Sequence, residues 1–298
     1  MNILISNDDG YNKPGIIALK KVLSKYGTVY MSAPLKEQSG KSISLTLKDD
    51  INYYMLDEYS IVVDGTPGDA AGIGLGYFSD IKFDLFVSGI NKGLNEGKDS
   101  LFSGTVGAGV IGSLASIKTI CLSGDFEEED YERRSEYILD YIFKNNLLDI
   151  APFLNVNFPR SSYPYTGKGI RVGRIYNVPK EANHLEDFGD KVFKTKKRGP
   201  LFDSPEDSDV YYSNHGYYSI TPFRPSLEDS EKIEALKRII ENWNQEISLL
   251  VSFYIIIIVY FWNCVYFRPN YFLNSVYLWQ NYFWKCVIFS WIYFLNCV

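Results

Sequence analysis

The sequence predicts an α/β fold in which helices cover both faces of a mostly parallel sheet. Short apolar runs alternate with helical patterns from residue 2 to residue 158, and this alternation is typical of parallel sheets. The strands are continuous apolar runs, as expected of strands buried on both faces. From Tyr163 to Pro222, short alternating strands mix with charged turns. This region predicts an antiparallel, hairpin-rich extension that reaches a neighbouring subunit.

The expected elements follow from local patterns. Pro14 suits the first turn of a helix, and the apolar residues after it recur at helical spacing. The expected strands are residues 2–6, 28–33, 61–63, 84–88, 119–122 and 153–158, with short ones at 170–176 and 217–221. The expected helices are residues 14–26, 104–117, 130–143 and 227–246, and one that begins at residue 69. The helix expected at 227–246 has an apolar face of Ile233, Leu236, Ile239, Ile240 and Trp243.

Composition divides the chain near residue 248. The 298 residues are 46% hydrophobic and 22% charged with a net charge of −6, which is typical of a globular protein. Residues 249–298 hold 18 of the 48 aromatic residues, but only two of the 30 basic residues and none of the 36 acidic ones. We therefore predict one domain over residues 1–248, irregular from about 163 to 225, and a separate hydrophobic tail over residues 249–298.

Charge and cysteine content limit the partners and the location. Residues 1–248 carry a net charge of −8, which argues against the basic stripe that binding to duplex nucleic acid requires. Their one cysteine, Cys121, ends an apolar strand and is expected to be a small core residue, so a reducing compartment is permitted. The N-terminus lacks the basic flank and long apolar core of a signal peptide. We expect a cytoplasmic location.

Two adjacent carboxylates, Asp8 and Asp9, follow the first expected strand. In an open α/β sheet, ligands bind at the carboxyl ends of the strands. Neighbouring carboxylates repel each other, and a bound cation relieves that repulsion. An Asp-Asp-Gly sequence alone is also typical of a solvated turn, so the other loops decide between the two interpretations.

Two further loops carry polar side chains after expected strands. The loop after the second strand holds Ser39 and, taken alone, is typical of a flexible turn. The segment 88–97, after the fourth strand, holds Asn91, Asn95 and three glycines, which is more than a connection needs. Glycine permits close approach of the backbone to a ligand, and asparagine offers a neutral oxygen ligand.

The segment Ser103-Gly104-Thr105 opens a small-residue helix, whose first N–H groups suit a phosphate and whose small side chains suit close packing on the sheet. Because all these loops follow strands of one parallel sheet, we expect them to share an edge. Every candidate metal ligand is an oxygen: Asp8, Asp9, Ser39 and Asn91. Such ligands suit Mg²⁺, Mn²⁺ or Ca²⁺ rather than zinc. The predicted chemistry is metal-assisted attack on a phosphoryl group.

Several motifs occur in a fixed order between residue 1 and about residue 225. They are Asn2–Gly10, Pro14–Ile16, Ala33–Pro34, Gln38–Gly40, Gly65–Pro67 with Asp69, Ser88–Gly97, Ser103–Val106 and Gly216–Pro222. Together they resemble the survival protein E (SurE) family of 5′/3′-nucleotidases, and the resemblance covers none of the tail. One departure is the helix after Ser103, which has Gly107 and Gly109 where the family commonly has alanine.

The resemblance implies a Rossmann-like α/β fold that binds one divalent cation per subunit, Mg²⁺ or Mn²⁺, and hydrolyses nucleoside monophosphates. The metal ligands of the family fall on Asp8, Asp9, Ser39 and Asn91, with the catalytic role on Asp8 and Asp9. Its phosphate-binding side falls on Asn95, Ser103, Gly104 and Thr105. Family members exchange C-terminal segments, so the resemblance also implies a homodimer or homotetramer.

Two other functions stay open on the sequence alone. A receiver-like phosphosignalling module also has an acidic pair after its first strand, and it would recruit Asp64 and Lys92, although it needs a much shorter chain. A membrane-tethered or structural role rests on the tail alone. His215 invites an acid/base role near a phosphate site, which the family does not require. His184 lies in a charged loop and is expected to be solvated.

The tail contains a repeat of 11 residues. The segment Tyr260–Val265 recurs at Tyr271–Val276, Tyr282–Val287 and Tyr293–Val298. Residues 249–267 are uncharged and long enough to span a membrane, whereas Pro269 and the many aromatic and β-branched residues work against a long helix. We interpret the tail as a translated tandem repeat fused to a complete enzyme, with a membrane or oligomerisation segment as the alternative.

Overall fold

The computed structural model describes residues 1–176, 185–187, 193–195, 204–225 and 230–267. Contacts within the chain divide it into two units, Met1–Ser226 and Leu227–Val298. The change in composition at residue 248 lies inside a helix of the second unit. The division into domains at residue 248 therefore stays a prediction.

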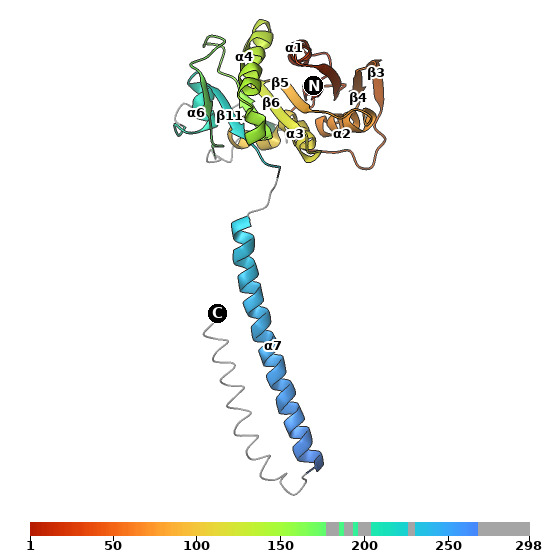
Figure 1. The fold of residues 1–298 in the computed structure, drawn as a ribbon, viewed down its shortest axis with the longest axis vertical. Coiled ribbons are helices and arrows are strands. Elements are labelled where there is room, and N and C mark those ends of the chain that lie inside the picture. Colours follow the sequence, from red (N-terminus) through yellow and green to blue (C-terminus); the bar gives the residue numbers. More distant parts are fainter. Residues whose placement is uncertain (177–184, 188–192, 196–203, 226–229, 268–298) are drawn as a thin grey trace. The chain divides into compact units, whose positions relative to one another are not determined.

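The first unit is built on a nine-stranded sheet (Figure 1) with the strand order β3-β4-β2-β1-β5-β6-β7-β11-β8. The strands are β1 (Asn2–Ser6), β2 (Thr28–Pro34), β3 (Tyr53–Asp57), β4 (Ser60–Val63), β5 (Leu85–Lys92), β6 (Lys118–Gly124), β7 (Phe153–Asn157), β8 (Ile170–Val172) and β11 (Tyr218–Pro222). The helices are α1 (Pro14–Leu23), α2 (Pro67–Tyr77), α3 (Gly104–Leu114), α4 (Tyr131–Lys144), α5 (Leu147–Ile150) and α6 (Asp209–Asn214), with 3₁₀ turns η1 (Gly97–Phe102) and η2 (Glu128–Asp130).

The six central strands, from β4 to β7 in the sheet order, are all parallel. Antiparallel strands flank them, because β3 pairs with β4 and β11 pairs with β7 in the opposite direction. The fold is therefore a mostly parallel, Rossmann-like α/β fold, as the sequence predicted. At its centre, Ile5 of β1 pairs with Met31 of β2 and Val87 of β5. The carboxyl ends of these strands consequently share one edge of the sheet.

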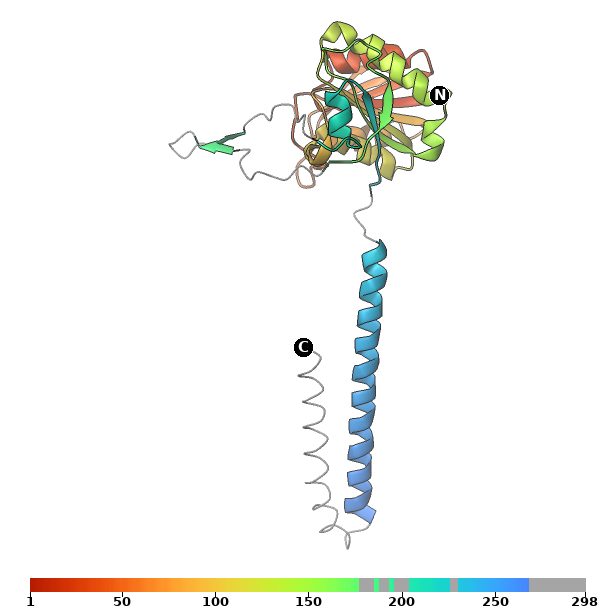
Figure 2. The same ribbon diagram turned by 90° about the vertical axis from the view of Figure 1, so that its left-hand side faces the viewer.

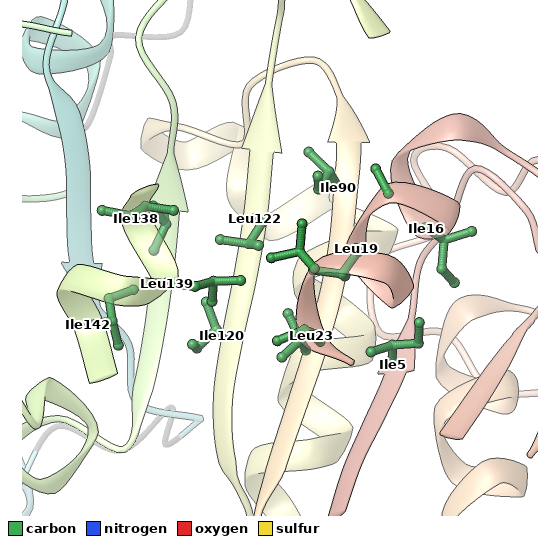
Figure 3. Close-up of a cluster of buried hydrophobic side chains, with 14 of the residues drawn as sticks. Ile5, Ile16, Leu19, Leu23, Ile90, Ile120, Leu122, Ile138, Leu139 and Ile142 are labelled. Atoms are coloured by element: carbon green, nitrogen blue, oxygen red, sulfur yellow. The ribbon is translucent and has the colours of Figure 1, made fainter. Parts of the chain in front are cut away.

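Two layers of helices cover the sheet. Alternate residues of β1 face opposite layers: Ile3 and Ile5 belong to one buried cluster and Leu4 to the other, which is the period of two expected of a strand. Figure 3 shows the first cluster, in which α1 and α4 pack on the sheet through Ile16, Leu19, Leu23, Ile138, Leu139 and Ile142. The second cluster contains Ala70 and Ala71 of α2 and Ala108 of α3. Both faces are therefore covered, as predicted.

Small residues let α3 lie close to the sheet and to the loop after β2. A Cβ atom at Gly109 would stand 2.3 Å from the Sγ atom of Cys121, and one at Gly107 would stand 2.1 Å from the carbonyl oxygen of Ser42. A side chain at either position would clash, which accounts for glycine where the family commonly has alanine. Cys121 is fully buried in the core, as expected.

Some elements differ from the sequence prediction. The expected helix 227–246 is in fact α7 (Ser230–Phe267), which continues well beyond residue 246 and is 38 residues long. The argument against a long helix in the tail was therefore wrong for residues 249–267, since Pro269 lies beyond the last residue of α7 and does not interrupt it. In addition, β3, α5 and α6 had no counterpart in the prediction, because each is only four to six residues long and too short to show a clear periodicity.

The expected hairpin-rich extension is described only in part. The strands β9 (Leu185–Asp187) and β10 (Phe193–Thr195) form an antiparallel pair separate from the main sheet (Figure 2). The strand expected over 170–176 is shorter, ending at Val172. Much of the rest of the predicted extension, including His184, lies outside the described residues.

Candidate functional site

The carboxylates of Asp8 and Asp9 are held at the end of β1 by a tight turn. Asn7 closes this turn, because its Nδ2 atom donates to the carbonyl oxygen of Gly10 at 2.9 Å and its Oδ1 atom accepts from the N–H of Gly10 at 3.3 Å. Gly10 has a φ of 118°, a conformation that a residue with a side chain rarely adopts. The Asp-Asp-Gly turn predicted from sequence is therefore present, and Asn7 shapes it.

Asp8 is buried, with only 3% of its surface exposed. The hydroxyl of Thr105, at the start of α3, donates to the Oδ1 atom of Asp8. Gly104 leaves room for this approach, since a Cβ atom there would stand 2.7 Å from the Cβ of Asp8. Burial raises the pKa of Asp8 to about 6, helped by the neighbouring charge of Asp9 and opposed by the Thr105 hydrogen bond.

Asp9 contacts the end of β5. Its Oδ2 atom accepts a hydrogen bond of 3.2 Å from the backbone N–H of Lys92. Burial raises the pKa of Asp9, while this hydrogen bond and the charge of Lys13 act in the opposite direction. Among the ion pairs that the described residues form, none includes Asp8 or Asp9. Within this part of the chain, the two adjacent carboxylates thus have no cationic side chain in direct contact.

The loop that carries Ser39 is bonded to the Asp8 backbone. The N–H of Gln38 donates to the carbonyl oxygen of Asp8 at 2.8 Å. The Ser39 hydroxyl donates to Glu37 at 3.1 Å, which leaves its oxygen with lone pairs for a further partner. The backbone therefore brings this loop to the acidic pair, as the sequence predicted.

Asn91 lies on β5, one residue before the Lys92 N–H that contacts Asp9. Its Nδ2 atom donates to the carbonyl oxygen of Gly93 at 2.9 Å. Because the amide nitrogen has this partner, the side chain is oriented and its Oδ1 atom remains as an acceptor. That is the atom a metal ligand would use. The segment that was expected to be a loop from residue 88 onward is strand as far as Lys92.

Asn95 is the most tightly held of the predicted phosphate contacts. Its backbone N–H donates to Asn157 Oδ1 at 2.8 Å, and its carbonyl oxygen accepts from the Nδ2 atoms of Asn155 and Asn157. Its own Nδ2 atom donates to the Ser123 hydroxyl at 2.8 Å. The side chains of β6 and β7 therefore fix the position of this loop.

Ser103 is the N-cap of α3, where its hydroxyl accepts from the Val106 N–H at 3.1 Å. Together with the Thr105 contact, this cap sets the start of α3 beside Asp8. The described residues contain no cluster of three or more His, Cys, Asp or Glu side chains that could hold a metal ion. A metal here would accordingly need hydroxyl and amide oxygens besides the two carboxylates, and an all-oxygen set suits a hard divalent cation.

Comparison with known protein families identifies the family to which this chain belongs. Residues 3–181 match the family model described as survival protein SurE. The chain belongs to the SurE family. It is 34% identical over 248 residues to a 5′-nucleotidase SurE of Actinobacillus succinogenes, a match that covers 81% of this chain and 100% of that protein. A 5′-nucleotidase SurE of Clostridium botulinum is also 34% identical, over 80% of this chain and 99% of the relative.

A solved structure agrees with these SurE sequences. The crystal structure of the SurE protein of Aquifex aeolicus superposes with a TM-score of 0.69 at 29% identity, covering 80% of this chain and 99% of that one. The relatives are thus matched over almost their whole length, while about a fifth of this chain lies outside each match.

A second group of carboxylates in this SurE chain was missed by the sequence analysis. Asp209 is fully buried, and its carboxylate accepts from the N–H groups of Gly97, Tyr176 and Val210 at 2.7, 3.1 and 2.9 Å. It is the first residue of α6, and an acidic residue that begins a short helix gives no signal for such a role. It joins the loop after Asn95 to the C-terminal part of the unit.

Glu96 is the other carboxylate of this group, and we call Glu96 and Asp209 the clamp carboxylates. The Ser213 hydroxyl donates to Glu96 Oε2, and the Arg160 Nη2 atom lies 3.9 Å from its Oε1. Burial raises the pKa of Glu96 to about 7, against the opposing effects of Ser213 and Arg160. In the sequence, the only indication of a role for Glu96 is its position directly after Asn95.

The structure gives His215 a local role. Its Nδ1 atom lies 2.8 Å from the carbonyl oxygen of Tyr211, and its ring stacks on the Tyr211 ring at 3.9 Å between centroids. These contacts are with α6, the helix that His215 caps. They do not favour the acid/base role that the sequence invited.

Proposed function

We propose that this protein is a divalent-metal-dependent nucleotidase that hydrolyses nucleoside monophosphates to nucleoside and phosphate. Two members of its family, each matched over almost its whole length, carry the name 5′-nucleotidase SurE. The observation that carries the proposal is the acidic pair itself: two adjacent carboxylates at the carboxyl edge of the sheet, without an ion pair among the described residues and next to the start of α3.

The residues divide into two sides. Asp8, Asp9, Ser39 and Asn91 would hold one Mg²⁺ or Mn²⁺ ion, through two carboxylates, a hydroxyl and an amide oxygen. When bound, such a cation polarises the phosphoryl group and activates water for attack. Its charge would also relieve the repulsion between Asp8 and Asp9, which no ion pair of the described residues neutralises.

The phosphate side would consist of Asn95 and of Ser103, Gly104 and Thr105. The first N–H groups of a helix such as α3 have no intrahelical partners and lie at the positive end of the helix dipole, which favours an anion. Thr105 has a second task, because its hydroxyl fixes the rotamer of Asp8. The phosphate and the acidic pair would therefore be aligned by the same turn of α3.

Phosphate release from a panel of nucleoside 5′- and 3′-monophosphates tests this proposal. We expect release with added Mg²⁺ or Mn²⁺, loss of release with a chelator, and near-complete loss in Asp8→Asn and Asp9→Asn. Asp149→Asn removes an exposed carboxylate that pairs with Lys118 and is expected to leave the rate unchanged. Undiminished release with chelator, or in either site variant, would refute the metal assignment, and the 3′ arm decides whether the activity extends beyond 5′-monophosphates.

The receiver-like alternative is not favoured by the sheet order. It would need Asp64 close to the acidic pair, but Asp64 follows β4, and β2 separates β4 from β1. Lys92 contributes its backbone N–H to Asp9. Transfer of phosphate to the protein, without repeated hydrolysis of a nucleoside monophosphate, would support the receiver-like alternative.

We further propose that the protein is a homodimer or homotetramer with its first unit in the cytoplasm, assembled through the hairpin-rich region between residues 163 and 225. The separate strand pair β9–β10 supports this, since an isolated two-stranded ribbon is marginally stable alone. Light scattering coupled to gel filtration gives the mass of the assembly. A monomer at micromolar concentration would contradict the proposal.

A further inference from the structure

The C-terminal half of α7 has the length of a membrane span. Residues 249–267 form 19 consecutive helical positions without a charged side chain. At a rise of about 1.5 Å per residue this stretch is about 28 Å long, close to the roughly 30 Å of a bilayer's hydrocarbon core. Among the described residues, one helix is long and apolar enough to cross a membrane, over Lys232–Val259.

The apolar stretch of α7 is neither a buried core helix nor a secretory signal. A core helix of a water-soluble protein is mostly buried, whereas no part of the apolar window within Lys232–Val259 is buried in the part of the chain that the structure describes. A secretory signal lies near the N-terminus, and α7 begins at residue 230. Neither role therefore accounts for the apolar character of this segment.

Apolar side chains surround α7 between residues 249 and 258. Residues 253–256 are Phe, Tyr, Ile and Ile, and successive positions in a helix are about 100° apart. Eight side chains in this part are between 48% and 72% exposed: Leu249, Leu250, Val251, Phe253, Tyr254, Ile255, Ile256 and Ile258. A helix on the surface of a soluble protein keeps a polar face, and a helix that is apolar all round is buried in protein or lipid.

The first half of α7 is different. Residues 230–248 alternate apolar side chains with charged ones, among them Lys232, Glu234, Lys237, Arg238, Glu241 and Glu246. Trp243 lies shortly before the uncharged stretch, and Arg268 follows it directly. Tryptophan and arginine are enriched where a span meets the water interface. The helix therefore changes from a water-compatible to a lipid-compatible surface near residue 249.

We propose that α7 anchors the protein in a lipid bilayer, with residues 249–267 as the spanning segment and the first unit in water. A second copy of the chain is a weaker candidate for the partner, since pairing of two helices covers one stripe of each and would leave the other apolar sides in water. About a fifth of the chain lies outside the match to each relative, which leaves room for an added anchor.

Flotation of the full chain tests the anchor independently of the enzymatic proposal. The protein is synthesised without detergent in the presence of phosphatidylcholine–phosphatidylglycerol vesicles, which are then floated on a density gradient and washed with alkaline carbonate. We expect the chain to float with the vesicles and to resist the wash. Aggregated protein sediments instead, and a chain paired only with a second copy stays in the soluble fractions. Either result would overturn the proposal.

Matched variants distinguish a membrane-spanning helix from nonspecific adsorption to the vesicles. The double variant Ile256→Arg/Ile258→Arg places two charges in the middle of the stretch and is expected to lower the floated fraction at least about tenfold. The control Ile239→Arg/Ile240→Arg makes the same change in the amphipathic half, where both side chains are also more than half exposed, and is expected to float like the unchanged chain. Equal flotation of both variants would contradict a span at 249–267. Phosphate release, measured on the same samples, reports separately on the first unit.

Discussion

Two groups of largely buried carboxylates lie near the carboxyl edge of one sheet, and they differ in their partners. The acidic pair, Asp8 and Asp9, receives the hydroxyl of Thr105 and the backbone N–H of Lys92, and the backbone of Thr105 also favours the ionised form of Asp8. The clamp carboxylates, Glu96 and Asp209, receive three backbone N–H groups, a hydroxyl and a nearby guanidinium. Burial raises the pKa in both groups. A raised pKa alone thus does not distinguish the proposed ligand site from a structural contact, and the two groups differ instead in the hydrogen-bond donors that they receive.

The largest effect is expected on activity, from a substitution in the acidic pair. Asp8→Asn keeps an oxygen for the Thr105 hydroxyl but removes a carboxylate that we propose as a metal ligand. We therefore expect kcat/KM for nucleoside monophosphates to fall at least about a hundredfold, since mutation of a residue that only supports a metal ligand already costs roughly 10–100-fold in metal affinity or activity. Because the change also removes a buried charge beside Asp9, the metal-free variant is expected to melt no lower than the unchanged protein. Phosphate release and thermal melting measure the two quantities.

The control for Asp8→Asn is Asp207→Asn, an exposed carboxylate that pairs with Arg174. It is expected to change neither rate nor melting temperature appreciably. If Asp8→Asn lowered the melting temperature while keeping activity, Asp8 would belong with the clamp carboxylates and the distinction by donor number would fail.

The second effect is on stability. Asp209→Ala leaves the N–H groups of Gly97 and Tyr176 without their acceptor, and each buried unsatisfied group costs about 1–3 kcal/mol. We expect a loss of about 3 kcal/mol in the free energy of unfolding, or roughly 6–12 °C in melting temperature for a unit of this size. Denaturant titration measures it. A loss below about 0.5 kcal/mol in the free energy of unfolding would mean that Asp209 does not hold the loop that contains Gly97 in place.

The sequence could predict the acidic pair but not the clamp. Asp8, Asp9 and Ser39 follow strands and Asn91 lies near the end of one, and in a parallel sheet the carboxyl ends of the strands meet at one edge. The backbone contacts Gln38 to Asp8 and Lys92 to Asp9 agree with that placement. The assignment of these residues as ligands stays a prediction, because a ligand role depends on a cation that strand order alone does not report.

The clamp depends on contacts between distant parts of the chain. Asp209 bonds to Gly97 across 112 residues and Ser213 to Glu96 across 117, and no local pattern encodes such a distance. The length of α7 was missed for a different reason. Helix propensity, which argued against it, is a weak predictor, and Pro269 lies beyond the last residue of α7. The parallel sheet itself was predictable, since buried strands and amphipathic helices have distinct periods.

The smallest effect concerns the pH dependence of stability through Glu96. Its pKa in the folded protein is about 7, above the ordinary value of 4.5, so the folded state binds the proton more tightly than the unfolded state does. The free energy of unfolding must then fall as the pH rises from about 4.5 to above 7. Glu96→Gln removes this dependence, because the amide stays neutral at every pH.

We expect Glu96→Gln to melt close to the unchanged protein at pH 5 and above it at pH 8. The gain should be about 1–2 kcal/mol, less than the roughly 3 kcal/mol that the whole pKa shift represents, because Arg160 loses a partner charge when the carboxylate is replaced. Glu132→Gln is the matched control, since its exposed carboxylate pairs with Lys21 and should give nearly pH-independent differences. A variant less stable than the unchanged protein at pH 8 would show that the ionised Glu96–Arg160 pair stabilises the fold, and that the clamp carboxylates act by charge rather than by hydrogen-bond donors.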